Sequence, residues 1–227
     1  MKKKLKVGLI GSTGRMGQEI EKILGASKTS ELFYAPLRKA KLDEKKAAQV
    51  DVWIDFSQPE AFADNLKMAE KFKTPFVCGT TGFGAKEKAL LKKSSIKIPL
   101  LWSSNMSLGV AVLNEALKSF SAIPHFDFQI EEIHHNKKKD KPSGTAITLQ
   151  ENLNAVIGKE APEPLAIRGG GVFGVHKIFA LSDEEVITFE HQALNRTVFA
   201  RGAVTAAEWL ANKKPGLYQM RDVLFGK

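Results

Sequence analysis

The segment from Glu132 to Ala146 carries more side chains able to do chemistry than any other stretch of the chain. It reads Glu-Ile-His-His-Asn-Lys-Lys-Lys-Asp-Lys-Pro-Ser-Gly-Thr-Ala, which places two imidazoles and a run of lysines before a Ser-Gly-Thr step. His134 can exchange a proton near neutral pH, and the lysines attract anions. The mixture predicts a site that binds a carboxylate or phosphate and moves a proton. The alternative is a solvated basic loop.

A helix is expected directly after this segment. Pro142 disfavours helix at the residue before it, and Ser143 can cap a following helix. The N–H groups of Gly144 and Thr145 would then point back at the lysines, and such a helix N-terminus is an anion site. The apolar positions that would bury one face of this helix are Ile147, Leu149, Leu153, Val156 and Ile157.

The beginning of the chain carries a second pattern. Leu5 to Ile10 is a short apolar run suited to a buried strand, the glycine-rich run Gly11 to Gly17 follows, and an amphipathic stretch comes next. Glycines in such a turn let the backbone approach a pyrophosphate, which rests on the helix N-terminus. The spacing G-x-x-G-x-x-G is a variant of the usual fingerprint, and a plain tight turn is the alternative. The position between a strand and a helix favours dinucleotide binding.

The end of the expected second strand indicates which dinucleotide is bound. NAD-binding units usually present an acid there to hold the ribose 2′-hydroxyl. This chain presents Arg38, Lys39 and Lys41 instead, with no acid before Asp43. Cations suit a 2′-phosphate, so we predict that NADPH is preferred and that NADH use is possible. The alternative is that these are surface cations of a basic protein.

Length and composition fit a globular protein. A chain of 227 residues, 43% of them hydrophobic, can bury a full core in one large or two small domains. No apolar run approaches the roughly 20 residues of a membrane span, and the N-terminal lysines lead directly into the first strand. We therefore expect a cytoplasmic protein without a membrane partner. Cys78 is the only cysteine, which excludes disulfides within the chain and a thiolate metal cluster.

The formal net charge of +9 would also fit a nucleic-acid partner. Basic residues are spread along the chain, however, and no aromatic side chains alternate with them as a stacking surface. Anionic small molecules explain the charge equally well, so no nucleic acid is expected. His125, His176 and His191 occur singly on strand patterns, and no metal site is expected.

Strands and helices alternate through the first hundred residues, which predicts an α/β fold. We expect an N-terminal Rossmann dinucleotide-binding domain over residues 1–105, built on a parallel sheet. The loops Gly79 to Gly82 and Ser103 to Met106 would share its ligand crevice with the glycine turn, because ligands bind at the carboxyl ends of such strands. Longer strands over 126–134, 172–180 and 186–194 predict a second α+β domain on a mixed sheet, for substrate binding and oligomerisation, over residues 106–199. A helix over 203–212 places residues 200–227 back on the first domain.

The chain resembles the dihydrodipicolinate reductase family, also called 4-hydroxy-tetrahydrodipicolinate reductases, nearly from end to end. The most specific motif is Glu132 to Ala146. The other motifs that carry the resemblance are Val7 to Gly17, Asp55-Phe56-Ser57, Gly79 to Phe83, Ser104 to Gly109, Asn195 to Ala200 and Gly216 to Leu224. The resemblance implies a homotetramer that reduces a cyclic unsaturated dicarboxylate, 4-hydroxy-tetrahydrodipicolinate, with NAD(P)H in diaminopimelate and lysine biosynthesis.

The resemblance also assigns roles to particular residues. It implies that His134 and Lys138 are catalytic and exchange protons with the substrate, and that no metal takes part. The substrate dicarboxylate would be bound by His135, Ser143, Gly144 and Thr145. The cofactor would be bound by Gly11, Ser12, Thr13, Gly14, Arg15, Met16, Gly79, Thr80, Thr81, Ser103, Ser104, Asn105, Met106 and Arg196. The place of Arg38 at the 2′-phosphate is predicted from the missing acid and not from the resemblance.

Two alternatives from other classes fit parts of the sequence. An NADPH-sensing protein without catalysis would use the glycine turn, but it has no use for a proton donor beside an anion site. Another two-domain Rossmann dehydrogenase, acting on an amino acid or a sugar, would share the fold and differ in substrate. The chain also departs from many family members in two ways: Arg38 stands where they have an acid, and the loops around 161–171 are shorter.

Overall fold

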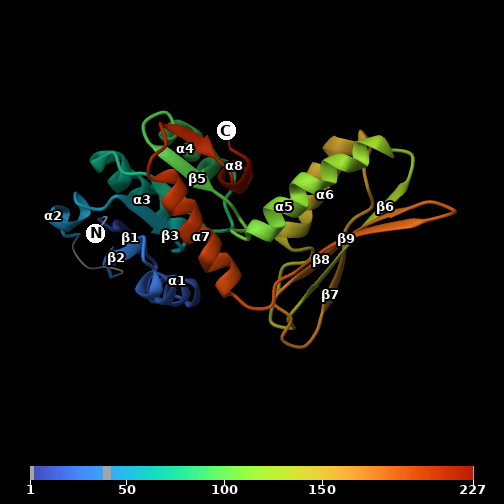
Figure 1. The fold of residues 1–227 in the computed structure, drawn as a ribbon, viewed down its shortest axis with the longest axis horizontal. Helices are drawn as coiled ribbons and strands as arrows, with labels where there is room; N and C mark the ends of the chain where they lie inside the picture. The colour runs from blue at the N-terminus through green and yellow to red at the C-terminus, as the bar shows by residue number, and fades with distance from the viewer. Residues whose placement is uncertain (1–2, 38–41, 227) are drawn as a thin grey trace. The chain divides into compact units, whose positions relative to one another are not determined.

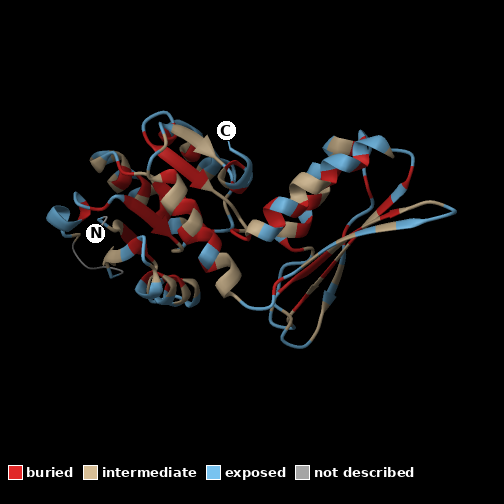
Figure 2. Cartoon of the chain, viewed as in Figure 1, coloured by how far each residue is buried: buried red, intermediate tan, exposed pale blue. Residues whose placement is uncertain are grey.

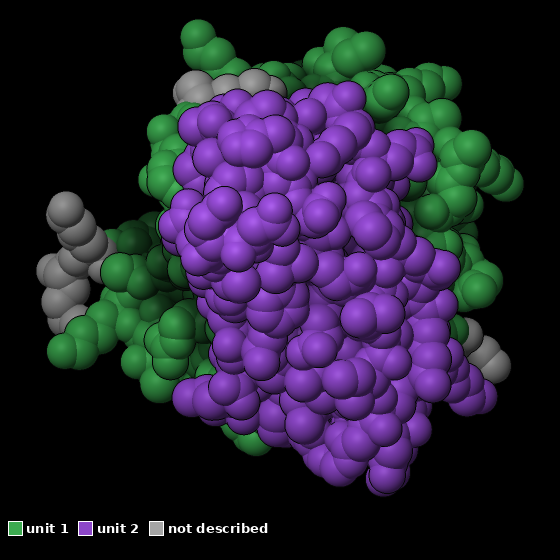
Figure 3. All heavy atoms as spheres, turned by 90° about the vertical axis from the view of Figure 1, so that its right-hand side faces the viewer, with its two compact units in different colours: residues 1–108, 197–227 green, residues 109–196 purple. Residues whose placement is uncertain are grey.

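The computed structural model describes residues 3–37 and 42–226. The chain forms two compact units, shown in green and purple in Figure 3. Unit 1 consists of residues 1–108 and 197–227, and unit 2 of residues 109–196. The sequence patterns change at 105 and 200, within a few residues of these limits. Each unit has its own sheet and its own core.

Unit 1 is a six-stranded sheet in the order β10-β5-β4-β3-β1-β2, and all of its strand pairs are parallel. This doubly wound arrangement is the predicted Rossmann-type fold. Its strands are β1 (Leu5–Ile10), β2 (Ser30–Tyr34), β3 (Val52–Asp55), β4 (Phe76–Cys78), β5 (Pro99–Trp102) and β10 (Gly216–Tyr218). Its helices are α1 (Arg15–Ala26), α2 (Glu44–Ala47), α3 (Pro59–Phe72), α4 (Ala85–Ser94), α7 (Thr197–Leu210) and α8 (Met220–Phe225).

The central strands of unit 1 are buried on both faces, as Figure 2 shows in red. On one face Trp53, Phe62 and Phe76 belong to one apolar cluster, to which α3 and α4 contribute. On the other face α7 lies across β3, β4 and β5 and packs against α1 (Figure 1). Parallel sheets need this cover on both sides, because their strands have no polar face. Cys78 is part of the core, as expected.

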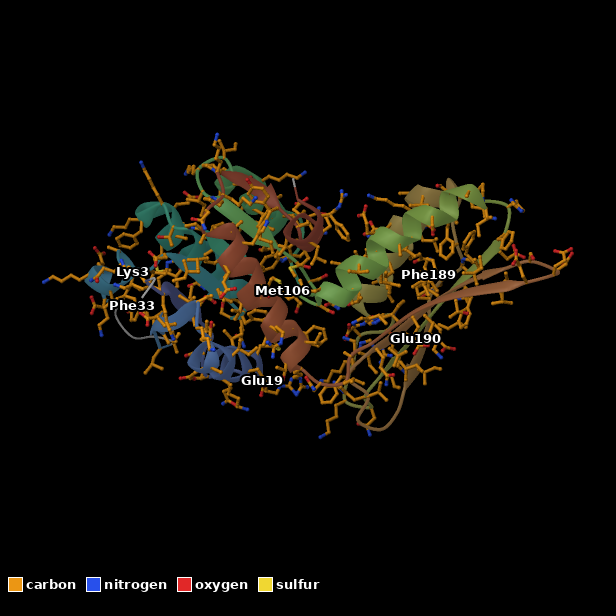
Figure 4. The ribbon with its side chains drawn as sticks, in the orientation of Figure 1. Lys3, Glu19, Phe33, Met106, Phe189 and Glu190 are labelled. Carbon is orange, nitrogen blue, oxygen red and sulfur yellow. The ribbon has the colours of Figure 1, made fainter. Side chains whose placement is uncertain are left out.

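Helix α7 begins earlier than predicted. The pattern indicated a helix over 203–212, whereas the structure has Thr197–Leu210. Thr197, Val198 and Gly202 have low helix propensity, and tertiary contacts override it. The Thr197 hydroxyl donates to the Glu19 carboxylate of α1 at 3.1 Å, and Gly202 packs against the backbone of Met106. Figure 4 labels Glu19 and Met106.

Unit 2 is a four-stranded sheet in the order β7-β6-β8-β9, with β6 and β7 parallel and the other pairs antiparallel. The sheet is mixed, as predicted, but β7 was not among the predicted strands. Its strands are β6 (Asp127–His134), β7 (Leu165–Arg168), β8 (Val175–Leu181) and β9 (Val186–Gln192). The helices α5 (Leu108–Ala116), η1 (Leu117–Ala122) and α6 (Gly144–Ile157) cover one face through a core that includes Phe120, Phe128 and Leu149. Phe189 of β9 stacks on Phe120 at 4.7 Å (Figure 4). Within the described ranges, no helix is both long and apolar enough to span a membrane.

The contact between Gly202 and Met106 predicts a large effect of one methyl group. A Cβ at Gly202 would stand 1.7 Å from the Met106 carbonyl oxygen, which is backbone and cannot rotate away. We expect Gly202→Ala to lower the free energy of unfolding by roughly 3 kcal/mol, the upper range of overpacking. Urea unfolding followed by circular dichroism measures the change.

Gly25→Ala is the matched control, because Gly25 lies in α1 and an added Cβ there has no atom within 4 Å. This change should leave stability equal or raise it by about 0.4 to 1 kcal/mol, since alanine restricts the unfolded chain. Equal midpoints for the two variants would show that α7 can shift away from Met106 at little cost.

Candidate active site

The carboxyl ends of four neighbouring strands of unit 1 lie in register. Ile10 pairs with Asp55, Asp55 with Cys78, and Cys78 with Trp102. Backbone hydrogen bonds continue one residue further, from Gly79 N–H to the Asp55 carbonyl at 2.9 Å and from Ser103 N–H to the Cys78 carbonyl at 3.2 Å. The three predicted cofactor loops, which start at Gly11, Gly79 and Ser103, therefore leave the sheet along one edge. Strand order reverses at β1, where such folds bind ligands.

The glycines of the first loop are required by close packing. Gly11 has φ of +82°, and an added Cβ would stand 2.6 Å from the Phe56 carbonyl oxygen. A Cβ at Gly17 would stand 2.3 Å from the Gly11 carbonyl oxygen, and one at Gly79 would stand 2.3 Å from the Phe56 ring. Phe56 thus lies against two of the three loops, and only glycine fits beside it.

The Asp55 carboxylate orders the loop that carries Phe56. It is fully buried and accepts hydrogen bonds from the Ser57 N–H at 2.8 Å and from the Asn65 side chain at 3.1 Å. Burial raises the pKa of Asp55, and the hydrogen bonds from Ser57 and Asn65 oppose the shift only in part. The Asp55 carboxylate therefore holds the loop after β3 in place by hydrogen bonds. The sequence pattern did not predict this role.

The N-terminus of α1 fits an anion. Gly14 is its N-cap residue and has no side chain that could cap the helix, and Gln18 N–H donates to the Gly14 carbonyl at 3.0 Å. The amides of Arg15, Met16 and Gly17 therefore precede the first intrahelical bond, as in other helices that bind phosphate. Ser12 and Thr13 lie in the same loop. Glycine at positions 11 and 17 lets the loop backbone keep this tight turn, because a side chain at either position would displace it. The backbone amides of the turn suit a pyrophosphate.

The structure does not place two predicted cofactor residues at this sheet edge. Arg38 is outside the described residues, and so is Lys39. Arg196 is the last residue of unit 2, where its guanidinium lies over the Phe173 ring at 5.6 Å. The predicted catalytic and substrate-binding residues also belong to unit 2.

Strand register gathers the polar residues of unit 2. Glu132 and His134 share the helix-covered face of β6, because side chains alternate along a strand. Glu132 pairs with His176 of β8, and His134 pairs with Arg168 of β7. The rings of His134 and His176 are 5.2 Å apart. Three strands thus place these four side chains side by side beneath the start of α6.

The Glu132 carboxylate is the centre of this cluster and is fully buried. Its Oε1 accepts from Arg168 Nη2 at 2.6 Å and from the Ser143 N–H at 3.0 Å. Its Oε2 accepts from Arg168 Nη1 at 2.7 Å and lies 2.5 Å from His134 Nδ1. Burial pushes the pKa of Glu132 upward, but hydrogen bonds from Arg168 and His134 outweigh it and hold the pKa below its ordinary value. The group is therefore an ionised carboxylate at neutral pH.

An ionised carboxylate only accepts hydrogen bonds, so His134 carries its hydrogen on Nδ1. Burial lowers the pKa of His134, Glu132 raises it, and the charges of Lys138 and Arg168 lower it again, leaving the pKa below its ordinary value. The ring is therefore neutral at pH 7, with a lone pair on Nε2. Nε2 lies beside Gly174, where an added Cβ would be only 3.0 Å away.

Lys138 is held close to this cluster by a tight turn and an ion pair. Its N–H donates to the His135 carbonyl at 3.1 Å, and its ammonium group lies 2.9 Å from Asp140 Oδ2. Burial acts to raise the pKa of Asp140, but the hydrogen bond and charge of Lys138, with smaller contributions that include the charge of Arg168, together outweigh burial and lower the pKa. Arg168 Nη2 also donates to the Asp140 carbonyl at 2.6 Å, so one guanidinium joins Glu132 to the Lys138 segment.

Ser143 caps α6 as predicted. Its Oγ accepts from the Ala146 N–H at 3.2 Å and lies 3.2 Å from His176 Nε2. Burial lowers the pKa of His176 to about 3, so this ring is neutral at pH 7 and shares one hydrogen bond with the Ser143 hydroxyl. Gly144 and Thr145 are the first residues of the helix, and Gly144 is exposed with open space around its Cα.

Sequence reasoning missed three residues of this cluster, Glu132, Arg168 and His176. No role was predicted for Arg168 from the sequence, and His176 was interpreted as a single histidine on a strand pattern. Alternation along β6 places Glu132 on the same face as His134 and was the available signal. The pairing of β6 with β7 and β8 had no signal in the sequence. In the described part of the chain, no group of three or more His, Cys, Asp or Glu side chains could hold a metal ion.

Known proteins match the chain along its whole length. The family described as dihydrodipicolinate reductase, N-terminus, matches residues 5–106, and dihydrodipicolinate reductase, C-terminus, matches residues 109–224. A 4-hydroxy-tetrahydrodipicolinate reductase of Bdellovibrio bacteriovorus is 74% identical, over 99% of this chain and 98% of that protein. One from Pelagibacter ubique is 39% identical, over 98% of each chain.

A solved structure confirms the predicted fold. The dipicolinate-bound dihydrodipicolinate reductase from Paenisporosarcina sp. TG-14 superimposes with a TM-score of 0.78 at 19% identity, over 96% of this chain and 98% of that chain. The resemblance predicted from the motifs is therefore confirmed, and the chain belongs to the dihydrodipicolinate reductase family of oxidoreductases.

Proposed function

We propose which residues carry out the reaction of this family in the present enzyme, the reduction of 4-hydroxy-tetrahydrodipicolinate to tetrahydrodipicolinate with NAD(P)H. The observation that carries the proposal is the cluster in unit 2. There His134, Lys138 and the N-terminus of α6 are tied to one buried carboxylate by the hydrogen bonds of Glu132 and Arg168. A neutral imidazole, an ammonium group and an anion-binding helix end are what the reduction of a cyclic dicarboxylate needs.

The N-terminus of α6 binds a substrate carboxylate. Gly144 and Thr145 supply the first amides of the helix, and the Ser143 cap fixes their direction. His135 adds a polar group from the turn that begins at the end of β6, and its backbone N–H is held by the Val172 carbonyl at 2.7 Å. The dipicolinate bound to the solved relative is itself a cyclic dicarboxylate, which supports this assignment.

Lys138 is the proton donor. When bound, the reduced nicotinamide supplies a hydride to the conjugated C=C–C=N system of the substrate. Electron density in the substrate then moves toward the ring nitrogen, which requires a proton. The Lys138 ammonium group has protons to give, and Asp140 positions it. His134 has its lone pair on Nε2, so it can accept a proton from water there and pass that proton to the neutral Lys138 amine, which restores the ammonium group.

The dinucleotide is held in unit 1. The pyrophosphate binds at the loop Gly11 to Met16, and the loops Gly79 to Thr81 and Ser103 to Met106 bind the remainder along the same sheet edge. The preference for NADPH rests on Arg38, and a contribution from Arg196 rests on the family motif. The enzyme acts in the cytoplasm, in diaminopimelate and lysine biosynthesis.

The enzyme also assembles with copies of itself through the open face of the unit 2 sheet. Register places on this face seven apolar side chains, Ile133, Leu165, Ile167, Val175, Phe179, Leu181 and Val186. Leu165 and Val186 are 56% and 58% exposed. An apolar sheet face of this kind is typical of an interface, and closed symmetric association would produce the homotetramer.

Lys138→Met tests the proton donor. The change removes the ammonium proton with little loss of length, so kcat should fall by roughly 10²-fold, the scale of general acid catalysis. The dissociation constant for NADPH should stay unchanged. Oxidation of NADPH by the enzyme with freshly generated substrate measures kcat, and nucleotide fluorescence measures binding. Lys139→Met is the control, since Lys139 is exposed in the same run. Near-normal turnover of Lys138→Met would assign the proton to another group.

Arg38→Asp tests the cofactor preference. A charge-assisted contact to the 2′-phosphate is worth about 1.5 to 3 kcal/mol, so the wild type should bind NADPH at least roughly ten-fold more tightly than NADH. The variant should lose this preference. Lys28→Asp makes the same type of charge change ahead of β2, at the other end of that strand, and should keep it. Equal affinities of the wild-type enzyme for both nucleotides would refute the assignment.

Leu165→Lys combined with Val186→Lys tests the assembly. We expect the wild type to sediment with about four times the chain mass of 25.0 kDa, and the double variant to dissociate because lysine ammonium groups resist burial. Analytical ultracentrifugation gives both masses. Ile96→Lys is the control, since Ile96 is 80% exposed but lies in unit 1. A monomeric wild type would remove the proposal.

A further inference from the structure

We propose that Glu132 is a positioning residue for the reduction: its carboxylate fixes the tautomer and orientation of His134 and joins that ring to the substrate helix and to the Lys138 segment. The expected effect of Glu132 on catalysis rests on the proposed function. The structural content of the inference, the state of the His134 ring, can be measured without any substrate.

The two oxygens of the Glu132 carboxylate accept hydrogen bonds from different elements. Arg168 donates one hydrogen bond to each oxygen, at 2.6 and 2.7 Å. The remaining acceptor positions are taken by the Ser143 N–H on Oε1 and by His134 on Oε2. Each contact comes from a different part of the chain, namely β7, the start of α6 and the end of β6.

A purely structural ion pair would need only Arg168. The side chains of Glu132 and Arg168 are 0% and 6% exposed, so their charges compensate each other away from water. The contacts to His134 and Ser143 go further, because both residues stand where chemistry and substrate binding are proposed. His134 would otherwise be able to place its hydrogen on either ring nitrogen.

The tautomer decides what His134 can do. With the Nδ1 hydrogen given to Glu132, Nε2 keeps its lone pair and points toward the side of Gly174. With the hydrogen on Nε2, the same nitrogen would donate rather than accept. Lys138, Arg168 and His176 also surround the ring, but two of these are cations without an acceptor, and His176 Nε2 is engaged by Ser143. Glu132 is thus the group that selects the tautomer.

Arg168 extends the same control to Lys138. Its Nη2 donates both to Glu132 and to the Asp140 carbonyl, at 2.6 Å in each case. The Asp140 side chain in turn holds the Lys138 ammonium group at 2.9 Å. Movement of the carboxylate would therefore displace the imidazole, the helix end and the ammonium group together.

The first experiment is a nitrogen-15 spectrum of the histidine rings in the wild-type protein, with His134→Gln used to assign the His134 signals. We expect the neutral form with hydrogen on Nδ1 near pH 7. A neutral ring with hydrogen on Nε2 in the folded wild type would overturn the proposal, whatever the behaviour of any variant.

The second experiment replaces Glu132 by Gln together with Arg168 by Gln, which removes both buried charges at once and avoids an isolated one. We expect the His134 signals to move toward the other tautomer or a mixture. We also expect kcat to fall by about 10-fold to 100-fold, the usual effect of removing such a supporting group, with unchanged NADPH binding. Glu151→Gln, at an exposed position of α6, should leave the ring and kcat as in the wild type.

Glu132→Asp separates positioning from charge. Aspartate retains the charge opposite Arg168 but is one methylene shorter, so it should fold, shift the tautomer ratio and lower kcat to an intermediate value. A folded Glu132→Asp with wild-type histidine signals and kcat within two-fold would overturn the proposal. A wild-type enzyme without reductase activity but with the expected tautomer would refute the proposed function and leave the role of Glu132 in place.

Discussion

The buried carboxylate of Glu132 is the constraint on which the site in unit 2 depends. A charge without water is costly unless its acceptor positions are filled, and here Arg168, His134 and the Ser143 N–H fill them. Because these donors belong to different elements, the need to satisfy one carboxylate fixes the relative positions of two strands and a helix terminus. Structural and chemical requirements are met by the same hydrogen bonds.

In unit 1 the positions of the loops at the strand ends are set mainly by backbone pairing and close packing, and less by charged groups. Its strand ends are set by backbone register, and its loops by the absence of side chains at Gly11, Gly17 and Gly79. Around Phe56 the chain packs so closely that an added methyl group would meet backbone or ring atoms. The edge of the sheet can therefore present backbone amides to an anion, which suits a cofactor whose phosphates are recognised by shape and charge.

The two faces of the unit 2 sheet carry different side chains, because side chains alternate along each strand. One face carries Glu132, His134 and His176 beneath α6, and the other carries apolar residues such as Leu165 and Val186. A shift of register by one residue would exchange the faces and place the histidines on the open side. The proposed catalytic roles and the proposed assembly thus depend on the same pairing.

The sequence by itself determined the family, the fold class, the Ser143 cap and the loops at the strand ends, because each depends on residues close together in the chain. The glycine turn and the capped helix are local patterns, and alternation along β6 is too. The roles of Arg168 and His176 were decided only by the tertiary structure. They lie 36 and 44 positions after Glu132 in the sequence, and strand pairing alone brings them to it. The early start of α7 has the same cause, since the packing of Gly202 on Met106 outweighs local helix propensity.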